Sequence, residues 1–226
     1  MKRPPIGSRG LRQKLRTAKG RSTSSQAWLE RQINDPYVRA AKAEGYRSRA
    51  AYKLIEMNEK YRFLKRGMTI VDLGAAPGGW TQIAVDRVGD KGRVVGIDIQ
   101  EMDAIPGALL MKLDFMDAAA PALIKSALGG PVGAVLSDMA TPATGHRETD
   151  HMRIMALCEA ALEFALEVLA PGGTFLAKVL RGGTERVMLD TLKRRFTKVV
   201  HVKPPASRAD SAEMYVLALG LKTATP

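Results

Sequence analysis

From residue 67 onward, short apolar runs alternate with longer stretches in which apolar residues recur at helical spacing. The runs are rich in Val, Ile and Leu, which is typical of strands buried on both faces of a parallel sheet. Strands that alternate with helices predict an α/β fold, a mostly parallel sheet covered by helices on both faces. The expected strands are 69–74, 92–99, 109–114, 132–139, 172–180, 197–202 and 214–221, and the expected helices are 80–88, 120–128, 150–170 and 185–196.

The last two expected strands are joined by only about ten residues, 203–212. A parallel crossover needs about a dozen residues or more, so we expect the final strand to run antiparallel. In sheets of this kind, ligands bind beyond the carboxyl ends of the strands, where the strand order reverses. Polar side chains at those ends are therefore the first candidates for a functional site.

The chain before residue 67 has a different pattern. Residues 1–25 are rich in Pro, Gly, Ser and basic side chains, which predicts a flexible tail. Residues 26–66 form a basic helical lead-in: one or two short helices around the Asp35-Pro36 break, then a helix from about residue 48 that Ser48 can cap. We expect three parts: this tail, this lead-in carrying Lys53, and a sheet domain at 67–226.

The net charge of +12 is concentrated at the front of the chain. Residues 1–29 carry eight bases and no acid, residues 30–66 ten bases against five acids, and residues 67–226 seventeen against eighteen. The sums are +8, +5 and −1, so a polyanion is the expected partner of the basic front end. A solvated tail without a partner, an anionic membrane surface and an organelle transit peptide are the alternatives.

Composition excludes several other classes. No apolar run approaches the ~18 residues of a membrane span, and the N-terminus lacks the apolar core of a secretory signal. The single cysteine, Cys158, lies in a helical pattern as a small core residue, and with three histidines nothing has zinc-ligand spacing. We therefore expect a cytoplasmic protein with neither disulfide nor metal, and a monomer.

A glycine-rich loop, "DLGAAPGGW" at 72–80, follows the first expected strand and opens a helix. Gly74 allows the sharp turn, while Gly78 and Gly79 let main chain approach a ligand. Dinucleotide loops read G-x-G-x-x-G and present many backbone donors to a pyrophosphate, whereas Pro77 removes one here. An ordinary tight turn would look the same, so the loop alone decides little.

Acids at the ends of three strands strengthen the case for a ligand. Asp98, Asp114 and Asp138 end the second, third and fourth expected strands. A carboxylate at the second strand can bind both ribose hydroxyls of a nucleoside. Together with the loop, these acids favour a nucleoside without phosphate, S-adenosylmethionine rather than a nicotinamide dinucleotide.

Four charged side chains alternate in sign along the chain: Lys53, Asp138, Lys178 and Glu213. Lys178 interrupts the buried pattern of "FLAKVL", although lysine is almost never buried without a partner. It could reach water along its aliphatic stem, and the four could form two ordinary surface salt bridges. Asp138 and Lys178 should, however, be neighbours at the carboxyl edge of the sheet.

Several motifs in chain order resemble the FtsJ-type family of ribosomal-RNA 2′-O-methyltransferases, from about Tyr46 to Leu221. The motifs are "SRAAYKL", "VDLGAAPGGW", "SDMA", the "KV" of the fifth strand and "SRADSAEMY". The loop "MATPATG" and the sequence "LRGG" depart from the family pattern at places that border the RNA side. The resemblance implies a Rossmann-like, seven-stranded methyltransferase sheet with the last strand antiparallel.

The resemblance also implies roles for individual residues. Its catalytic Lys-Asp-Lys-Glu tetrad falls on Lys53, Asp138, Lys178 and Glu213. Its S-adenosylmethionine contacts fall on Gly78, Trp80, Asp98, Asp114 and Asp138. Bacterial members methylate a uridine ribose in the A loop of large-subunit ribosomal RNA, which makes ribosomal RNA or the large subunit the expected partner.

We interpret Lys178 as the acceptor of the ribose 2′-hydroxyl proton. Lys53 and Glu213 would position the ribose, and Asp138 would link the tetrad to the cofactor. Lys53 favours a neutral Lys178 and the carboxylates favour its charged form, so the direction of the pKa shift stays open. Arg47 and Arg49 are candidates to guide a phosphate.

Candidates in the predicted tail for RNA binding are Arg9, Arg12, Lys14 and Arg16. Three alternatives to a ribosomal-RNA enzyme remain: a 2′-O-methyltransferase for messenger-RNA caps or transfer RNA, a non-catalytic RNA-binding factor in ribosome assembly, and a nicotinamide-dependent oxidoreductase.

Overall fold

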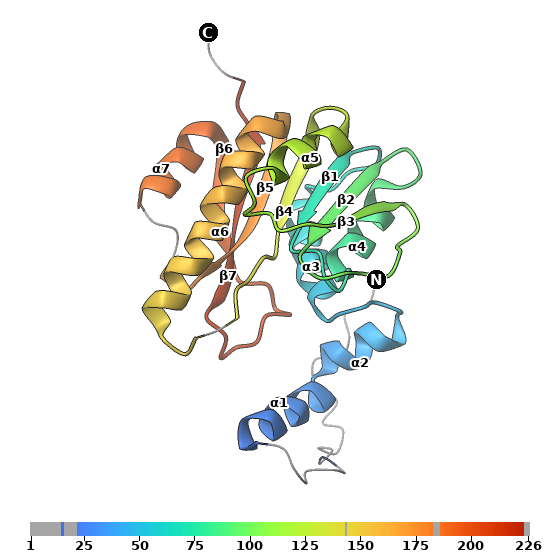
Figure 1. Cartoon of the computed structure of the whole chain (residues 1–226), viewed down its shortest axis with the longest axis vertical. Helices are drawn as coiled ribbons and strands as arrows, with labels where there is room; N and C mark the ends of the chain where they lie inside the picture. The colour runs from blue at the N-terminus through green and yellow to red at the C-terminus, as the bar shows by residue number, and fades with distance from the viewer. Residues whose placement is uncertain (1–14, 16–21, 143, 183–185, 224–226) are drawn as a thin grey trace.

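The computed structural model describes Leu15 and residues 22–142, 144–182 and 186–223, which contain one seven-stranded sheet (Figure 1). The strand order is β3-β2-β1-β4-β5-β7-β6, and only β7 runs antiparallel to its neighbours. The predicted α/β fold and the antiparallel last strand are confirmed. The strands are β1 Thr69–Leu73, β2 Arg93–Asp98, β3 Ala108–Lys112, β4 Val132–Ser137, β5 Leu169–Leu180, β6 Phe196–Val202 and β7 Glu213–Leu221.

Helices cover both faces of the sheet because successive strand residues point to opposite sides. Val71 packs in the hydrophobic cluster beneath α5, α6 and α7, which contains Cys158 as predicted, and Ile70 packs in the cluster beneath α3 and α4. The helices of the sheet domain are α4 Gly79–Val88, α5 Ala120–Leu128, α6 Arg147–Val168 and α7 Arg186–Arg195.

The lead-in consists of α1 Thr23–Asn34, α2 Pro36–Ala43 and α3 Ala50–Tyr61. Asp35 separates the first two helices: its backbone N–H ends α1, and its side chain accepts a hydrogen bond from Tyr37 N at the start of α2. The prediction that Ser48 caps α3 is wrong, because α3 follows Arg49 without a side-chain cap and Ser48 Oγ is buried without a partner.

Helix α1 begins inside the predicted tail, with Ser22 accepting a hydrogen bond from Ser25 N at its start. The tail candidates Arg9, Arg12, Lys14 and Arg16 lie outside the described residues. Figure 1 shows α1 and α2 extending away from the sheet, below α3.

Candidate active site

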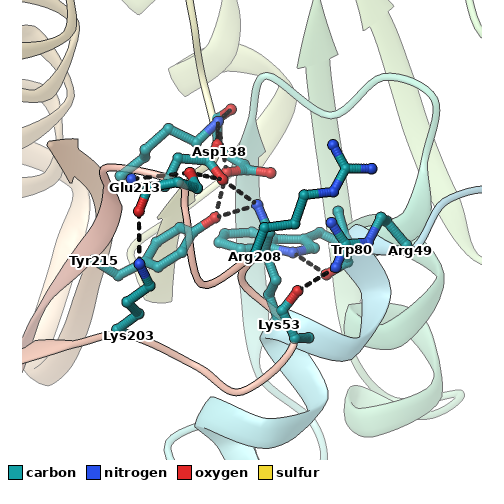
Figure 2. Close-up of polar contacts among 12 residues, drawn as sticks. Arg49, Lys53, Trp80, Asp138, Lys203, Arg208, Glu213 and Tyr215 are labelled. Atoms are coloured by element: carbon teal, nitrogen blue, oxygen red, sulfur yellow. Dashed lines mark hydrogen bonds and ion pairs between the residues drawn. The ribbon is translucent and has the colours of Figure 1, made fainter. Parts of the chain in front are cut away.

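The fold brings the four alternating charges together at the carboxyl ends of the central strands. Lys178 lies in β5, Glu213 begins β7, Asp138 directly follows β4, and Lys53 lies in α3 (Figure 2). Lys178 is paired with Tyr215 across the β5–β7 ladder, and Glu213 lies two residues along the same strand. Because side chains alternate along a strand, all three point to the face covered by α3.

Five side chains form a closed ring of polar contacts, here called the charged ring. Lys178 Nζ lies 2.9 Å from Asp138 Oδ1 and 3.5 Å from Glu213 Oε1. Lys53 Nζ donates to Glu213 Oε2 and to Tyr215 Oη, each at 3.1 Å. Tyr215 Oη in turn donates to Asp138 Oδ1 at 2.8 Å, which closes the ring. Figure 2 shows these contacts converging between the strands and α3.

Burial distinguishes the charged ring from a pair of surface salt bridges. Lys53 and Lys178 are each only 7% exposed, so neither ammonium depends on bulk water alone. Burial lowers the pKa of Lys178, but the charges of Asp138 and Glu213 outweigh this and raise it above its usual value. The direction that sequence left open is therefore upward, and the resting group is an ammonium.

The two carboxylates have the complementary shift. Burial raises the pKa of Asp138, but Lys178 and Lys53 lower it further than burial raises it. Glu213 follows the same pattern, with burial opposed by Lys53 and then Lys178, and its net pKa is also lowered. At neutral pH the ring thus holds two cations and two anions, which stabilise one another in place of water.

Tyr215 is the member of the ring that sequence reasoning missed. Its side chain is fully buried, and burial followed by the charge of Asp138 raises the pKa of its phenol, which remains protonated and donates to that carboxylate. The Trp80 ring lies 5.6 Å from the Tyr215 ring, and Trp80 Nε1 donates to Ala50 O. The available signal was spacing, because Tyr215 shares a strand face with Glu213.

A cavity of about 420 Å³ lies at the ends of β1, β2 and β4, and we call it the cofactor cavity. Gly74, Asp98, Asp114 and Asp138 line it, together with the exposed apolar side chain of Ile99. Three of the predicted cofactor contacts therefore border one cavity, and Asp138 belongs both to this cavity and to the charged ring.

Comparison with protein-family models assigns residues 46–221 to the family described as FtsJ-like methyltransferase. The chain belongs to this family. It is 61% identical to ribosomal RNA large subunit methyltransferase E of Parvibaculum lavamentivorans, over 96% of this chain and 89% of the relative. The protein of that name from Paramagnetospirillum magneticum is 58% identical, over 97% of this chain and 92% of the relative.

A solved structure shares the architecture. A Plasmodium falciparum chain, named as a ribosomal RNA methyltransferase, superimposes with a TM-score of 0.69 and 32% identity, covering 78% of this chain and 98% of that one. The predicted Rossmann-like methyltransferase fold is thus confirmed, and a nicotinamide-dependent oxidoreductase is not supported.

In this FtsJ-like methyltransferase the glycine loop packs mainly against the protein itself. A Cβ on Gly78, whose φ is +112°, would lie 2.7 Å from Ile105 Cδ1 and 3.1 Å from Arg47. Neither Gly78 nor Trp80 lines the cofactor cavity, so their predicted contact with the cofactor remains a prediction. The glycine at 78 is explained by internal packing.

The two arginines expected to guide phosphate are bound within the FtsJ-like fold. Arg47 donates to the carbonyls of Pro77, Asp103 and Ala104, at 3.3, 2.8 and 2.8 Å, and so joins the glycine loop to the loop after β2. Arg49 Nε lies 3.1 Å from Asp35 Oδ2, and its Nη2 donates to a carbonyl of the β6–β7 loop. These contacts give both arginines a structural role, and we assign them no phosphate.

Two searches of the described residues found no further site. No helix there is long and apolar enough to cross a membrane. Nor do three or more His, Cys, Asp or Glu side chains of that part of the methyltransferase gather where they could hold a metal ion.

Proposed function

We propose that this protein is an S-adenosylmethionine-dependent RNA 2′-O-ribose methyltransferase that acts on a uridine in the A loop of large-subunit ribosomal RNA. The charged ring is the observation that supports the chemistry, because it places a buried lysine between carboxylates at the edge of the cofactor cavity. The names of the relatives support large-subunit ribosomal RNA as the substrate.

The cofactor cavity fits S-adenosylmethionine, whose sulfonium supplies a reactive methyl group. Asp98 accepts hydrogen bonds from Ala76 N and Gln100 N, which fixes its carboxylate, and the remaining lone pairs face ribose hydroxyls. Asp114 Oδ1 accepts from Met116 N and leaves Oδ2 for the adenine edge. The exposed apolar side chains of Ile99 and Met116 both line the cavity and suit the faces of an adenine.

Methyl transfer to a ribose requires that O2′ lose its proton as the new O–C bond forms and the methyl–sulfur bond breaks. Lys178 Nζ is the proposed acceptor of that proton, and only its neutral form can accept. Lys53 and Glu213 orient the ribose, while Asp138 holds Lys178 through both a carboxylate oxygen and its backbone carbonyl. Alignment of the reactants within the two-sided site supplies up to ~7–11 kcal/mol of the barrier reduction.

The substrate follows from charge as well as from the relatives. The first 66 residues contain the whole positive excess, which suits an RNA backbone and is independent of its sequence. Messenger-RNA caps, transfer RNA and a purely structural role in ribosome assembly are the competing outcomes of the following test.

The test is a map of 2′-O-methyl groups on RNA from cells that lack this protein. We expect one uridine in the A loop to lose its methyl group, and the wild-type gene to restore it. A gene with Lys178→Met should not restore it. An unchanged map of large-subunit RNA, or a loss confined to caps or transfer RNA, would contradict the proposed substrate.

A further inference from the structure

A second cavity, of about 940 Å³, borders the charged ring. Lys178 and Glu213 line this cavity, whereas Asp138 lines the cofactor cavity. The two cavities meet at Ala140 and Thr141, which line both. The ring therefore separates a space suited to the methyl donor from a second space that the methyl acceptor can enter.

The second cavity has an apolar wall and a balanced charge. Met152 and Ile154 of α6 and Leu180 at the end of β5 supply the apolar surface. Its four flanking charged residues are two arginines and two acids, namely Arg147, Arg181, Glu148 and Asp150. A cavity of this kind repels a phosphate about as much as it attracts one, and it suits a ribose and a base better.

One of those acids is already bound within the protein. Asp150 Oδ1 accepts hydrogen bonds from Thr144 N at 2.8 Å and Thr144 Oγ1 at 2.7 Å. Arg147 and Arg181 are exposed, and within the described residues neither has a carboxylate partner. They are the cations available to phosphates on either side of a nucleotide in the cavity.

We propose that this cavity, here called the acceptor cavity, receives one unpaired nucleotide, with its ribose against Lys178 and Glu213 and its base against α6. The inference rests on the proposed function. Lys178 is only 7% exposed, so a ribose held in a continuous duplex cannot bring its O2′ to Nζ. Nucleotides in loops and bulges can be splayed out of the stack, and proteins read them in this form.

Met152 offers a way to fill the acceptor cavity without disturbing the core, because its side chain is 61% exposed on α6. We expect Met152→Trp to lower kcat/KM for methylation about tenfold or more, the effect of overfilling a packed site. The substrate is large ribosomal subunits from cells that lack the protein, with tritium-labelled S-adenosylmethionine. The affinity for S-adenosylmethionine, measured by calorimetry, should stay within about twofold, because the cofactor cavity is unchanged.

Leu123→Trp is the matched control, since Leu123 is also exposed on a helix and lines neither cavity. It should leave both constants within about twofold of the wild type. In addition, a complementary oligonucleotide that pairs the target nucleotide should abolish methylation of an A-loop RNA. Normal kcat/KM in Met152→Trp, or full methylation of the paired RNA, would overturn the acceptor cavity.

The two proposals fail in different ways. A wild-type protein that transfers no methyl group to any RNA contradicts the proposed function. In that event RNA affinity decides the cavity: weaker binding by Met152→Trp than by Leu123→Trp supports it, and equal binding by the two variants overturns it.

Discussion

Lys178 occupies a strand position that an aliphatic side chain would fill in most parallel sheets. It is tolerated there because Asp138 and Glu213 both lie within 3.5 Å of its Nζ. Burial lowers its pKa, but these carboxylates raise it more, so the net pKa lies above 10.5. The resting lysine is therefore charged and must lose a proton before it can accept one from O2′.

This gives methylation a defined pH dependence. The neutral fraction of a lysine with a raised pKa grows about tenfold per pH unit while the pH stays below that pKa. We expect kcat/KM to rise with that slope from about pH 7 to pH 9.5, in short assays that limit RNA hydrolysis. A profile that is flat across this window, with unchanged cofactor affinity, would exclude Lys178 as the proton acceptor.

At the scale of elements, alternation along strands explains what could be predicted. Apolar runs located all seven strands, and the short 203–212 connection predicted the antiparallel β7. Lys178 and Glu213 were placed at one edge by the same pattern. Tyr215 was read as an ordinary core residue, because its hydroxyl's partners come from Lys53 and Asp138, far apart in sequence.

Loops were harder to predict than strands, because their requirements come from tertiary contacts. The glycine at 78 accommodates Ile105 and Arg47, which sequence spacing does not reveal. Arg47 and Arg49 looked available for RNA, yet carbonyls and a carboxylate of the same chain bind them. Local pattern thus predicts where a loop lies and what residue types it has, and leaves open what each side chain contacts.

Gly74 provides a test of one such loop. Its φ is +75°, and a Cβ there would lie 2.7 Å from the backbone of Met139, next to Asp138. We expect Gly74→Ala to lower the free energy of unfolding by about 2 kcal/mol or more, from left-handed strain plus the collision. Because the collision moves the wall of the cofactor cavity, binding of S-adenosylmethionine should weaken as well.

The matched control is Gly172→Ala, which has a similar φ of +80° and no atom within 4 Å of the added Cβ. It should cost only the strain, about 1–2 kcal/mol, and leave cofactor binding normal. Urea unfolding and calorimetry measure the two quantities. Equal effects of the two substitutions would show that the packing of Gly74 against Met139 is unimportant.

At the scale of the whole molecule, charge and catalysis lie in different parts of the chain. The first 66 residues carry a formal charge of +13, from +8 and +5, and the sheet domain carries −1. The lead-in is tied to the β6–β7 loop, since Asp35 binds Arg49 at 3.1 Å and Arg208 at 3.5 Å. This loop runs directly into Glu213, so the basic front end and the charged ring form one structure.

Removing residues 1–21 tests the contribution of the tail, because this deletes eight bases and keeps Ser22, which caps α1. We expect weaker RNA binding and a shallower dependence of log Kd on log salt, since fewer phosphate contacts release fewer counterions. The affinity for S-adenosylmethionine should not change. RNA affinity and salt slope equal to those of the full chain would show that the tail does not bind RNA.

The most direct test of the account is the single-turnover rate of methyl transfer by Lys178→Met, measured beside its affinity for S-adenosylmethionine. The account predicts that the rate falls about 10²-fold or more, as for loss of a proton acceptor, while the affinity stays within about twofold. Lys125→Met, which changes an exposed lysine of α5 paired with Glu167, should behave as the wild type. A rate near the wild-type value in Lys178→Met would contradict the central claim that this buried lysine carries out the chemistry.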